Sequence, residues 1–224
     1  MSSTGNLASR NPFNSTYPLI CCVTDLIGLA SRQAQERFLQ GILRSGVDLI
    51  QLREKTASDL QVFGWMQGLV CGREGASPGI LVNTRMDMAV AADADGVHLS
   101  ATSLPIGLVR SCLGQDRLIG KSVHSQPEAV AAWQEGADYL FFGPVFETPS
   151  KARWGTPQGL LKLGEVCRLV PLPVFGIGGI HPGNAGAVIA CGARGVAAIG
   201  WFRDADDPAA RFRELADALG RNPG

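Results

Sequence analysis

The sequence has no excess of charge of either sign, and this absence limits the class of partner. Lysine and arginine together number 20, as do aspartate and glutamate, so the formal net charge is zero. Proteins that bind nucleic acid or membrane surfaces mainly through overall charge carry a basic excess. We therefore expect no nucleic-acid partner and no membrane partner, and any bound anion must be held by a few local basic residues.

Long hydrophobic runs are also missing. The apolar runs fall far short of the roughly 20 residues that a membrane-spanning helix requires. The first residues are rich in Ser, Asn, Thr and Gly and have no apolar centre of the kind found in a signal peptide. These features predict a disordered tail over residues 1–16 and a cytoplasmic protein.

Residue types that build metal centres are sparse. There are three histidines and six cysteines, and no two cysteines stand at a spacing typical of zinc ligands. Most cysteines lie in apolar stretches, which indicates buried, reduced thiols rather than a disulfide framework. We expect neither a metal site nor a disulfide.

Strand and helix patterns alternate through the rest of the chain. Its 224 residues are 46% hydrophobic, enough for one sizeable core. Helical spacing, as in Gln33–Leu43 and Ser58–Val70, separates short apolar runs typical of buried parallel strands. The eight runs are Leu19–Val23, Val47–Leu52, Ile80–Val82, Val97–Leu99, Leu118–Ile119, Tyr139–Phe142, Val174–Ile177 and Val196–Ile199.

A weak internal repeat favours closure of these strands into a barrel. Four segments share a turn, a buried strand and a small or polar residue at its end: Ser45–Arg53, Ala94–Ser100, Glu135–Gly143 and Cys191–Gly200. No linker marks a second domain. The sequence thus predicts a single (β/α)8 TIM barrel over residues 17–224, with an open doubly wound sheet as the alternative.

Polar residues follow the predicted strands, at the edge where such barrels place their chemistry. Gln51, Arg53 and Lys55 alternate at the end of the second strand, so we expect an amide and two cations to face the barrel mouth and bind phosphate or carboxylate. The alternative is an ordinary surface strand end in which Arg53 pairs with Glu54.

The third and fourth strands end without the pair of carboxylates that suits a hard divalent cation. Asn83 and Thr84 follow the third strand, and Thr102 and Ser103 lie beyond the fourth. Asn83 is a candidate substrate-binding residue. His98, within the fourth strand, is interpreted as a structural histidine.

Two further strand ends carry candidates. His124 follows Ser122 just past the fifth strand, and histidine is the side chain best suited to accept and return a proton near neutral pH; a helix-capping or hydrogen-bonding role is the alternative. The long loop after the sixth strand carries Thr148 and Lys151 as substrate-binding candidates, although Lys151 as a solvated lysine is also open. His181, before a later helix, is interpreted as structural or exposed.

Glycines mark the ends of the last two strands. Gly178 and Gly179 follow the seventh strand, and Ile199 and Gly200 follow the eighth. Backbone N–H groups can approach an anion closely at such positions, and barrels commonly hold a phosphate there. We predict that these four residues bind a substrate phosphate.

The motifs QLREK, GVHL, GKSVH, ADYLFFGPVFETPSK, GIGGI and GVAAIGWF, in this order, resemble the superfamily of thiamine phosphate synthase and thiazole tautomerase, from about Tyr17 to Leu219. The resemblance implies a (β/α)8 barrel. Synthases of this superfamily join a pyrimidine diphosphate to a thiazole phosphate with magnesium held by aspartates; tautomerases shift a proton in a carboxythiazole phosphate without metal.

At the positions of the synthase aspartates this chain has Asn83–Thr84 and Ala101–Ser103, and its SVH and VFET stretches resemble the tautomerase. We therefore predict a tautomerase with His124 as general acid/base, no cofactor and a thiazole phosphate as its small-molecule partner. Arg53 and Lys55, which match the superfamily's diphosphate-binding residues, would then line the mouth together with Ser122 and Lys151.

Two alternatives remain at this point. The first is thiamine phosphate synthase, which couples hydroxymethylpyrimidine diphosphate to thiazole phosphate and would require magnesium. The second is a non-catalytic regulatory protein that binds a thiamine precursor. A homodimer is compatible with all three.

Overall fold

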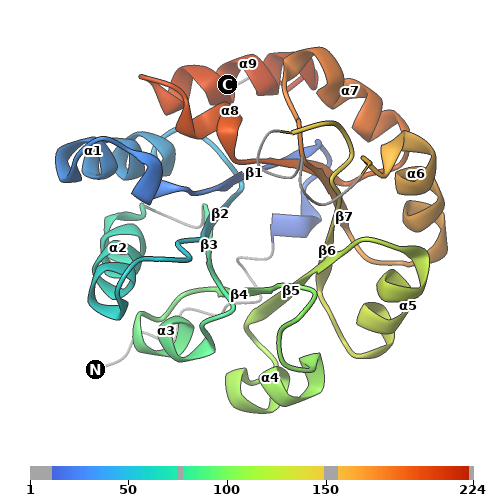
Figure 1. Cartoon of the computed structure of the whole chain (residues 1–224), viewed down its shortest axis with the longest axis horizontal. Helices are drawn as coiled ribbons and strands as arrows, with labels where there is room; N and C mark the ends of the chain where they lie inside the picture. Colours follow the sequence, from blue (N-terminus) through green and yellow to red (C-terminus); the bar gives the residue numbers. More distant parts are fainter. Residues whose placement is uncertain (1–11, 75–77, 149–155, 222–224) are drawn as a thin grey trace.

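The computed structural model describes residues 12–74, 78–148 and 156–221, and it shows a closed barrel of parallel strands surrounded by helices (Figure 1). Each strand pairs with the next along the chain, and β8 pairs with β1. The strands are β1 (Leu19–Val23), β2 (Leu49–Leu52), β3 (Gly79–Asn83), β4 (Gly96–Leu99), β5 (Leu118–Val123), β6 (Tyr139–Phe142), β7 (Val174–Ile177) and β8 (Gly195–Ala198). The prediction of a (β/α)8 barrel is confirmed, and the open sheet is wrong.

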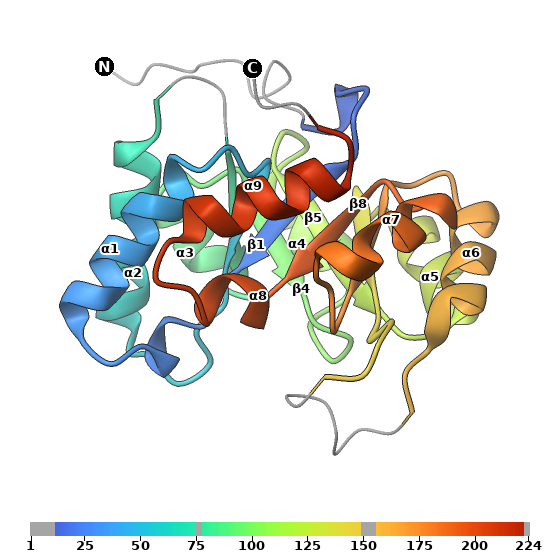
Figure 2. The ribbon, with the colours of Figure 1, turned by 90° about the horizontal axis from the view of Figure 1, so that it is seen from above.

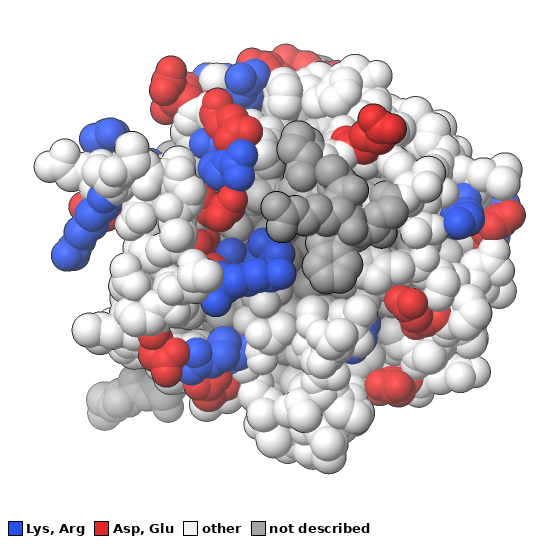
Figure 3. All heavy atoms as spheres, in the orientation of Figure 1, with Lys and Arg blue, Asp and Glu red and all other residues white. Residues whose placement is uncertain are grey.

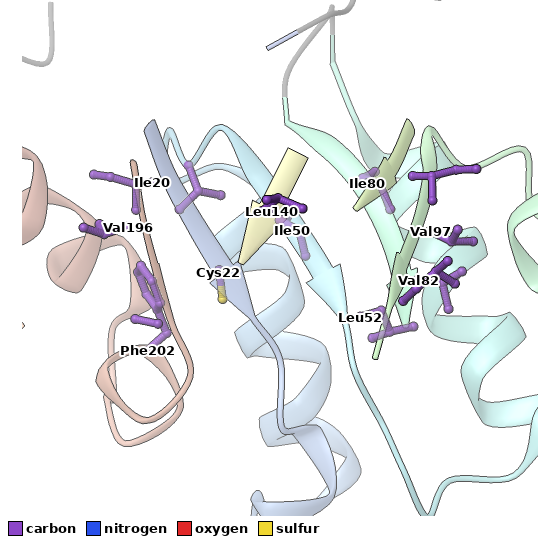
Figure 4. Packing of buried hydrophobic residues seen from close by; sticks show 14 of the residues in the cluster. Ile20, Cys22, Ile50, Leu52, Ile80, Val82, Val97, Leu140, Val196 and Phe202 are labelled. Carbon is purple, nitrogen blue, oxygen red and sulfur yellow. The ribbon is translucent and has the colours of Figure 1, made fainter. Parts of the chain in front are cut away.

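The strands are apolar on both faces because each separates two cores. Alternate residues such as Leu49, Tyr139 and Phe175 fill the interior of the barrel. The residues between them, such as Ile20, Ile50 and Leu140, pack outward against the helices (Figure 4). This double burial explains why the strands lack a polar face in the sequence.

The helices begin at the connections that leave the strands. Ser31, Ser58 and Ser125 cap three of them by accepting a hydrogen bond from a backbone N–H of the first turn. Within the described residues, no helix is both long and apolar enough to cross a membrane. The helices are α1 (Arg32–Leu43), α2 (Asp59–Gly72), α3 (Met86–Ala91), α4 (Ile106–Leu113), α5 (Gln126–Gln134), α6 (Gly159–Leu169), α7 (Pro182–Ala190), α8 (Gly200–Arg203) and α9 (Pro208–Ala218).

The internal repeat has a structural cause at the opposite end of the barrel from the mouth. An aspartate directly precedes β2, β4 and β6, and its carboxylate accepts a hydrogen bond from a backbone N–H of the preceding odd-numbered strand. Each aspartate also pairs with an arginine of a flanking helix or connection. The three sets are Asp48 with Ile20 and Arg221, Asp95 with Ile80 and Arg73, and Asp138 with Ile119 and Arg110.

At the fourth copy of the repeat an arginine replaces the aspartate. Arg194 precedes β8 and donates hydrogen bonds to the carbonyl of Tyr17, at 2.6 Å, and to the hydroxyl of Ser15, at 2.7 Å. These bonds hold the short 3₁₀ helix η2 (Pro12–Asn14), whose Phe13 ring packs 5.5 Å from the ring of Tyr139 inside the barrel. Residues 12–16 therefore lie against the barrel, residues 1–11 lie outside the described part of the chain, and the predicted extent of the tail stays a prediction.

Candidate active site

The predicted site residues lie at the carboxyl ends of the strands, where the connection from β6 leaves the barrel. In Figure 2 this connection extends to one side of the barrel, and η2 lies on the other. Seen from the carboxyl side, lysine and arginine atoms gather near the middle of the face, over the ends of β2 and β3 (Figure 3). This basic group is where the sequence predicts anion binding.

Arg53 is a cation without a described anionic partner. It directly follows β2, is half-buried, and forms no side-chain ion pair within the residues that the structure describes. Its neighbour Glu54 is engaged elsewhere: the carboxylate accepts hydrogen bonds from the Thr24 hydroxyl at 2.6 Å and from the backbone N–H of Leu26 at 2.8 Å. The alternative in which Glu54 neutralises Arg53 is therefore wrong.

Lys55 stands further from the mouth than the sequence pattern predicts. β2 ends at Leu52, so Lys55 lies in the following turn, where the alternation of strand residues no longer applies, and its side chain is exposed. The amide of Gln51, within β2, is buried and donates a hydrogen bond of 3.1 Å to the side-chain oxygen of Asn83 on β3. Gln51 and Asn83 thus form a neutral bridge beside Arg53.

A cavity of 330 Å³ opens next to this bridge, between the ends of β3 and β4. Hydroxyls of Thr84, Ser100, Thr102 and Ser103 line it, together with apolar side chains of β4, α3 and α4. Thr84 adopts a left-handed φ of 59°, and the hydroxyls of Ser100 and Ser103 lie 2.9 Å apart. The cavity therefore offers neutral hydrogen-bonding groups to a ligand.

The residues after β3 and β4 are also where the superfamily's aspartates would hold magnesium, an ion that prefers carboxylate and other oxygen ligands. Within the described ranges, no three His, Cys, Asp or Glu side chains cluster at a spacing suited to a metal. The nearby acid Asp87 is held by Arg85 at 2.6 Å, and Asp93, near the start of β4, pairs with Arg117. Hydroxyls replace carboxylates here, so these residues do not fit a magnesium site of the type that the superfamily implies.

A buried hydrogen-bonded chain crosses the interior below the mouth. His98 Nδ1 lies 3.0 Å from the hydroxyl of Tyr139, and His98 Nε2 lies 2.9 Å from the hydroxyl of Ser122. Burial, reinforced by the positive charges of Lys121 and Arg53, lowers the pKa of His98 to about 3, so its ring is neutral near pH 7. His98 is a hydrogen-bonded residue of the interior, and its contact with Ser122 links it to a predicted site residue.

Sequence reasoning missed Tyr139. Its hydroxyl belongs to a strand that otherwise supplies only Leu and Phe, and the residue was counted only as part of an apolar run. The signal that would have found it is its inward position on β6, in phase with Phe141, in a barrel interior where a buried hydroxyl requires a partner.

His124 lies at the mouth beyond β5. Its ring Nδ1 is 2.5 Å from the carbonyl oxygen of Gly143, which fixes Nδ1 as the protonated, donating nitrogen. Its backbone N–H bonds to Glu128, while Ser125 is the cap of α5, so the helix-capping alternative does not describe the His124 side chain. His181 instead caps α7 and is structural.

The glycines after β7 have the geometry that close backbone approach requires. Gly178 and Gly179 adopt positive φ angles of 100° and 67°. A side chain on Gly179 would lie 2.5 Å from the carbonyl oxygen of Glu147, and one on Gly178 would meet Pro144, so the β6 connection packs directly on this turn. Only glycine fits here.

The last predicted phosphate residues begin a short helix. Ile199 is the N-cap of α8 and Gly200 is its first residue, directly after β8. Barrels that hold a phosphate commonly use the connections after β7 and β8 together with such a helix.

Thr148 is half-buried in the β6 connection, and Lys151 lies outside the described residues. The phosphate and substrate roles of all these residues stay predictions.

The closed barrel defines the class of this protein: it is a (β/α)8 barrel with cations, hydroxyls and glycines at the carboxyl ends of its strands, the edge where such barrels place their sites. Residues 20–202 match the family model TMP-TENI, described as thiamine monophosphate synthase. The chain belongs to this family.

Individual relatives agree with this assignment. The chain is 40% identical to a thiamine-phosphate synthase of Roseiflexus castenholzii, over 94% of this chain and 92% of the relative, and 38% identical to one of Chlorobium limicola, over 92% and 95%. Among solved structures, a thiamine phosphate pyrophosphorylase from Pyrococcus furiosus is 30% identical, with a TM-score of 0.81, and covers 96% of this chain and 100% of its own.

These findings overturn the prediction of a thiazole tautomerase. The similar proteins are named as synthases, which corresponds to the first alternative. The prediction was wrong because it rested on the missing carboxylates alone, whereas an arginine can bind a diphosphate whether or not a protein also holds a metal. The acid/base role predicted for His124 belonged to the proton shift and is withdrawn with it.

Proposed function

We propose that this protein is a thiamine-phosphate synthase, which couples hydroxymethylpyrimidine diphosphate to a thiazole phosphate. The similarity to named synthases over more than nine-tenths of the chain supports this function. The single structural observation that carries it is the half-buried Arg53 at the barrel mouth, which forms no ion pair with any residue that the structure describes, while Glu54 is bonded to Thr24.

The coupling forms a carbon–nitrogen bond to the thiazole and breaks the carbon–oxygen bond to diphosphate. The departing diphosphate carries the developing negative charge, so catalysis depends on groups that stabilise that charge. In this chain Arg53 offers a planar guanidinium for bidentate binding, and Ser122 and the Gln51–Asn83 bridge offer neutral hydrogen bonds beside it. The backbone of Gly178, Gly179, Ile199 and Gly200 would hold the phosphate of the second substrate.

The direct test incubates the purified chain with hydroxymethylpyrimidine diphosphate, thiazole phosphate and magnesium. Thiamine phosphate and inorganic diphosphate should form in equal amounts. Arg53→Ala should lower kcat/KM by about 10- to 100-fold, the loss typical of a hydrogen bond to a charged group. Arg32→Ala, which removes an exposed arginine of α1 that pairs with Glu36, should leave the rate unchanged. Absence of thiamine phosphate from the wild-type reaction would refute the proposal.

A calorimetric titration of the substrate-free protein with magnesium tests the consequence of the missing carboxylates. Because the described hydroxyl-lined positions lack acidic ligands, magnesium should bind to the protein without substrate only weakly, and calorimetry should detect no site tighter than about 1 mM. A tight site in the substrate-free protein would contradict this expectation. A cytoplasmic location and a homodimer stay predictions, to be checked by fractionation and by light scattering.

A further inference from the structure

The Tyr139–His98–Ser122 chain joins three strands through inward-facing positions. Strand register places His98 on β4 and Tyr139 on β6 opposite the same residue, Gly120 of β5. A side chain at Gly120 would overlap the Tyr139 ring, so this glycine lets the phenol pass over β5 and reach His98. Ser122 lies two residues further along β5, nearer the mouth, where it is half-buried.

The proton on each member of the chain can be assigned. The phenol of Tyr139 is fully buried among the rings of Phe13, Phe141 and Phe175, and burial raises its pKa well above the ordinary value, so it keeps its proton. A buried O–H requires an acceptor, and within the described part of the chain the phenol's acceptor is His98 Nδ1, at 3.0 Å.

The hydrogen bond from Tyr139 leaves one possible tautomer for the neutral ring of His98. A neutral imidazole has one N–H and one acceptor nitrogen. Because Nδ1 accepts from Tyr139, the proton lies on Nε2, which donates to the oxygen of Ser122 at 2.9 Å. That bond occupies Ser122 as an acceptor, and its own O–H remains available to donate toward the mouth.

We propose that Tyr139 and His98 are positioning residues that fix Ser122 as a hydrogen-bond donor to an anionic oxygen of the substrate. The identity of that oxygen as part of a diphosphate or phosphate rests on the proposed function. The direction of the hydrogen bonds does not, since it follows from the buried chain itself. Ser122, which the sequence places only among the residues of the mouth, thereby acts as a donor rather than an acceptor toward the ligand.

The first test needs no activity. Nitrogen-15 NMR of the wild-type protein distinguishes the two neutral tautomers of histidine, and His98 should show a single form protonated on Nε2 at neutral pH. In Tyr139→Phe, Nδ1 of His98 loses the hydroxyl that donates to it, and the spectrum should show a mixture of the two His98 tautomers. A wild-type His98 protonated on Nδ1 would overturn the proposal without reference to any reaction.

The second test measures coupling between the residues. Ser122→Ala should weaken the binding of inorganic diphosphate, followed by calorimetry, about 10- to 100-fold, and Tyr139→Phe should weaken it about 3- to 10-fold. In the double variant, Tyr139→Phe should add nothing to the effect of Ser122→Ala, since the phenol acts through that hydroxyl. Tyr17→Phe, which removes the other phenol of the sequence, serves as the matched control.

The outcomes separate the two proposals. Independent, additive effects of Tyr139→Phe and Ser122→Ala on diphosphate binding would show that the phenol acts only through general stability and would overturn the positioning role. Failure of the wild-type protein to make thiamine phosphate would refute the proposed function, while the tautomer of His98 and the coupled loss of diphosphate binding would still be measurable.

Discussion

The hydroxyl of Thr24 and the carboxylate of Glu54 lie 2.6 Å apart, and this contact between the ends of β1 and β2 engages the acid that follows Arg53 in the sequence. Thr24 is fully buried, and its oxygen also accepts the backbone N–H of Arg53 at 3.0 Å. One side chain thus both orients the backbone of Arg53 and occupies the acid that would otherwise neutralise it.

Thr24→Val removes this hydroxyl while keeping the shape of the side chain. The backbone N–H of Arg53 then loses its acceptor and Glu54 loses a donor, so we expect the free energy of unfolding to fall by about 1–3 kcal/mol. Urea unfolding measures the change. Thr102→Val is the control, because Thr102 is exposed and its hydroxyl contacts Ser100 only at 3.4 Å. Equal effects of the two substitutions would contradict the special role of Thr24.

Arg73 and Asp95 form the most deeply buried ion pair described, each side chain only 6% exposed. Arg73→Met would leave the carboxylate of Asp95 buried without its cation, and we expect a loss of about 3–5 kcal/mol in the free energy of unfolding. Arg32→Met breaks a pair whose arginine is 89% exposed and should cost less than 1 kcal/mol, to order of magnitude. A small loss at Arg73, equal to that at Arg32, would contradict the prediction.

His98 gives the stability of the protein a predictable pH dependence. Its folded pKa, about 3, lies below the value of 6.5 for an ordinary histidine, so between these values the unfolded chain binds a proton that the folded chain does not. The free energy of unfolding should therefore fall as the pH drops from about 6.5, by about 1 kcal/mol per pH unit.

Replacement isolates this effect from that of the buried acids. Burial raises the pKa of Asp48 and of Glu54, which favours the folded state at low pH and opposes the contribution of His98. His98→Gln should flatten the acid slope relative to the wild type, whereas His181→Asn, which keeps a good helix cap on α7, should not change it. An unchanged slope in His98→Gln would refute the assignment.

Gly179→Ala examines the turn that joins the β6 and β7 connections. The substitution combines a positive φ of 67° with an approach of 2.5 Å to the Glu147 carbonyl, so the β6 connection must move. Gly136→Ala also has a positive φ, of 92°, but its side chain would meet nothing within 4 Å. We expect Gly179→Ala to cost about 1–3 kcal/mol more than this control in thermal unfolding and also to weaken phosphate binding, whereas Gly136→Ala should leave binding intact.

The barrel was predictable because its strands are buried on both faces. The ranges Leu19–Val23, Tyr139–Phe142 and Val174–Ile177 were predicted to the residue. The end of β5 was missed: the strand continues to Val123 through Gly120, Lys121 and Ser122, because its backbone pairs with both neighbouring strands whatever the side chains are. An apolar run shows where a parallel strand is buried, but it does not show where the backbone hydrogen bonds to the neighbouring strands end.

The candidate site was only partly predictable, for a related reason. Strand ends indicated which residues approach the mouth, as for Arg53 and His124. The partners that decide their chemistry come from distant parts of the chain: Thr24 for Glu54, Gly143 for His124 and Tyr139 for His98. No local pattern encodes such pairs. The choice between two reactions of one superfamily likewise depended on comparison with whole proteins rather than on one missing pair of acids.

The hydrogen bond from Arg194 to the carbonyl of Tyr17 joins two residues that are 177 positions apart in the sequence. During synthesis on the ribosome, the segment that carries Phe13 emerges before any strand of the barrel, whereas Arg194 is made only after β7. A nascent chain that ends before Arg194 therefore lacks the hydrogen bonds to Tyr17 and Ser15 that fasten this segment to the barrel.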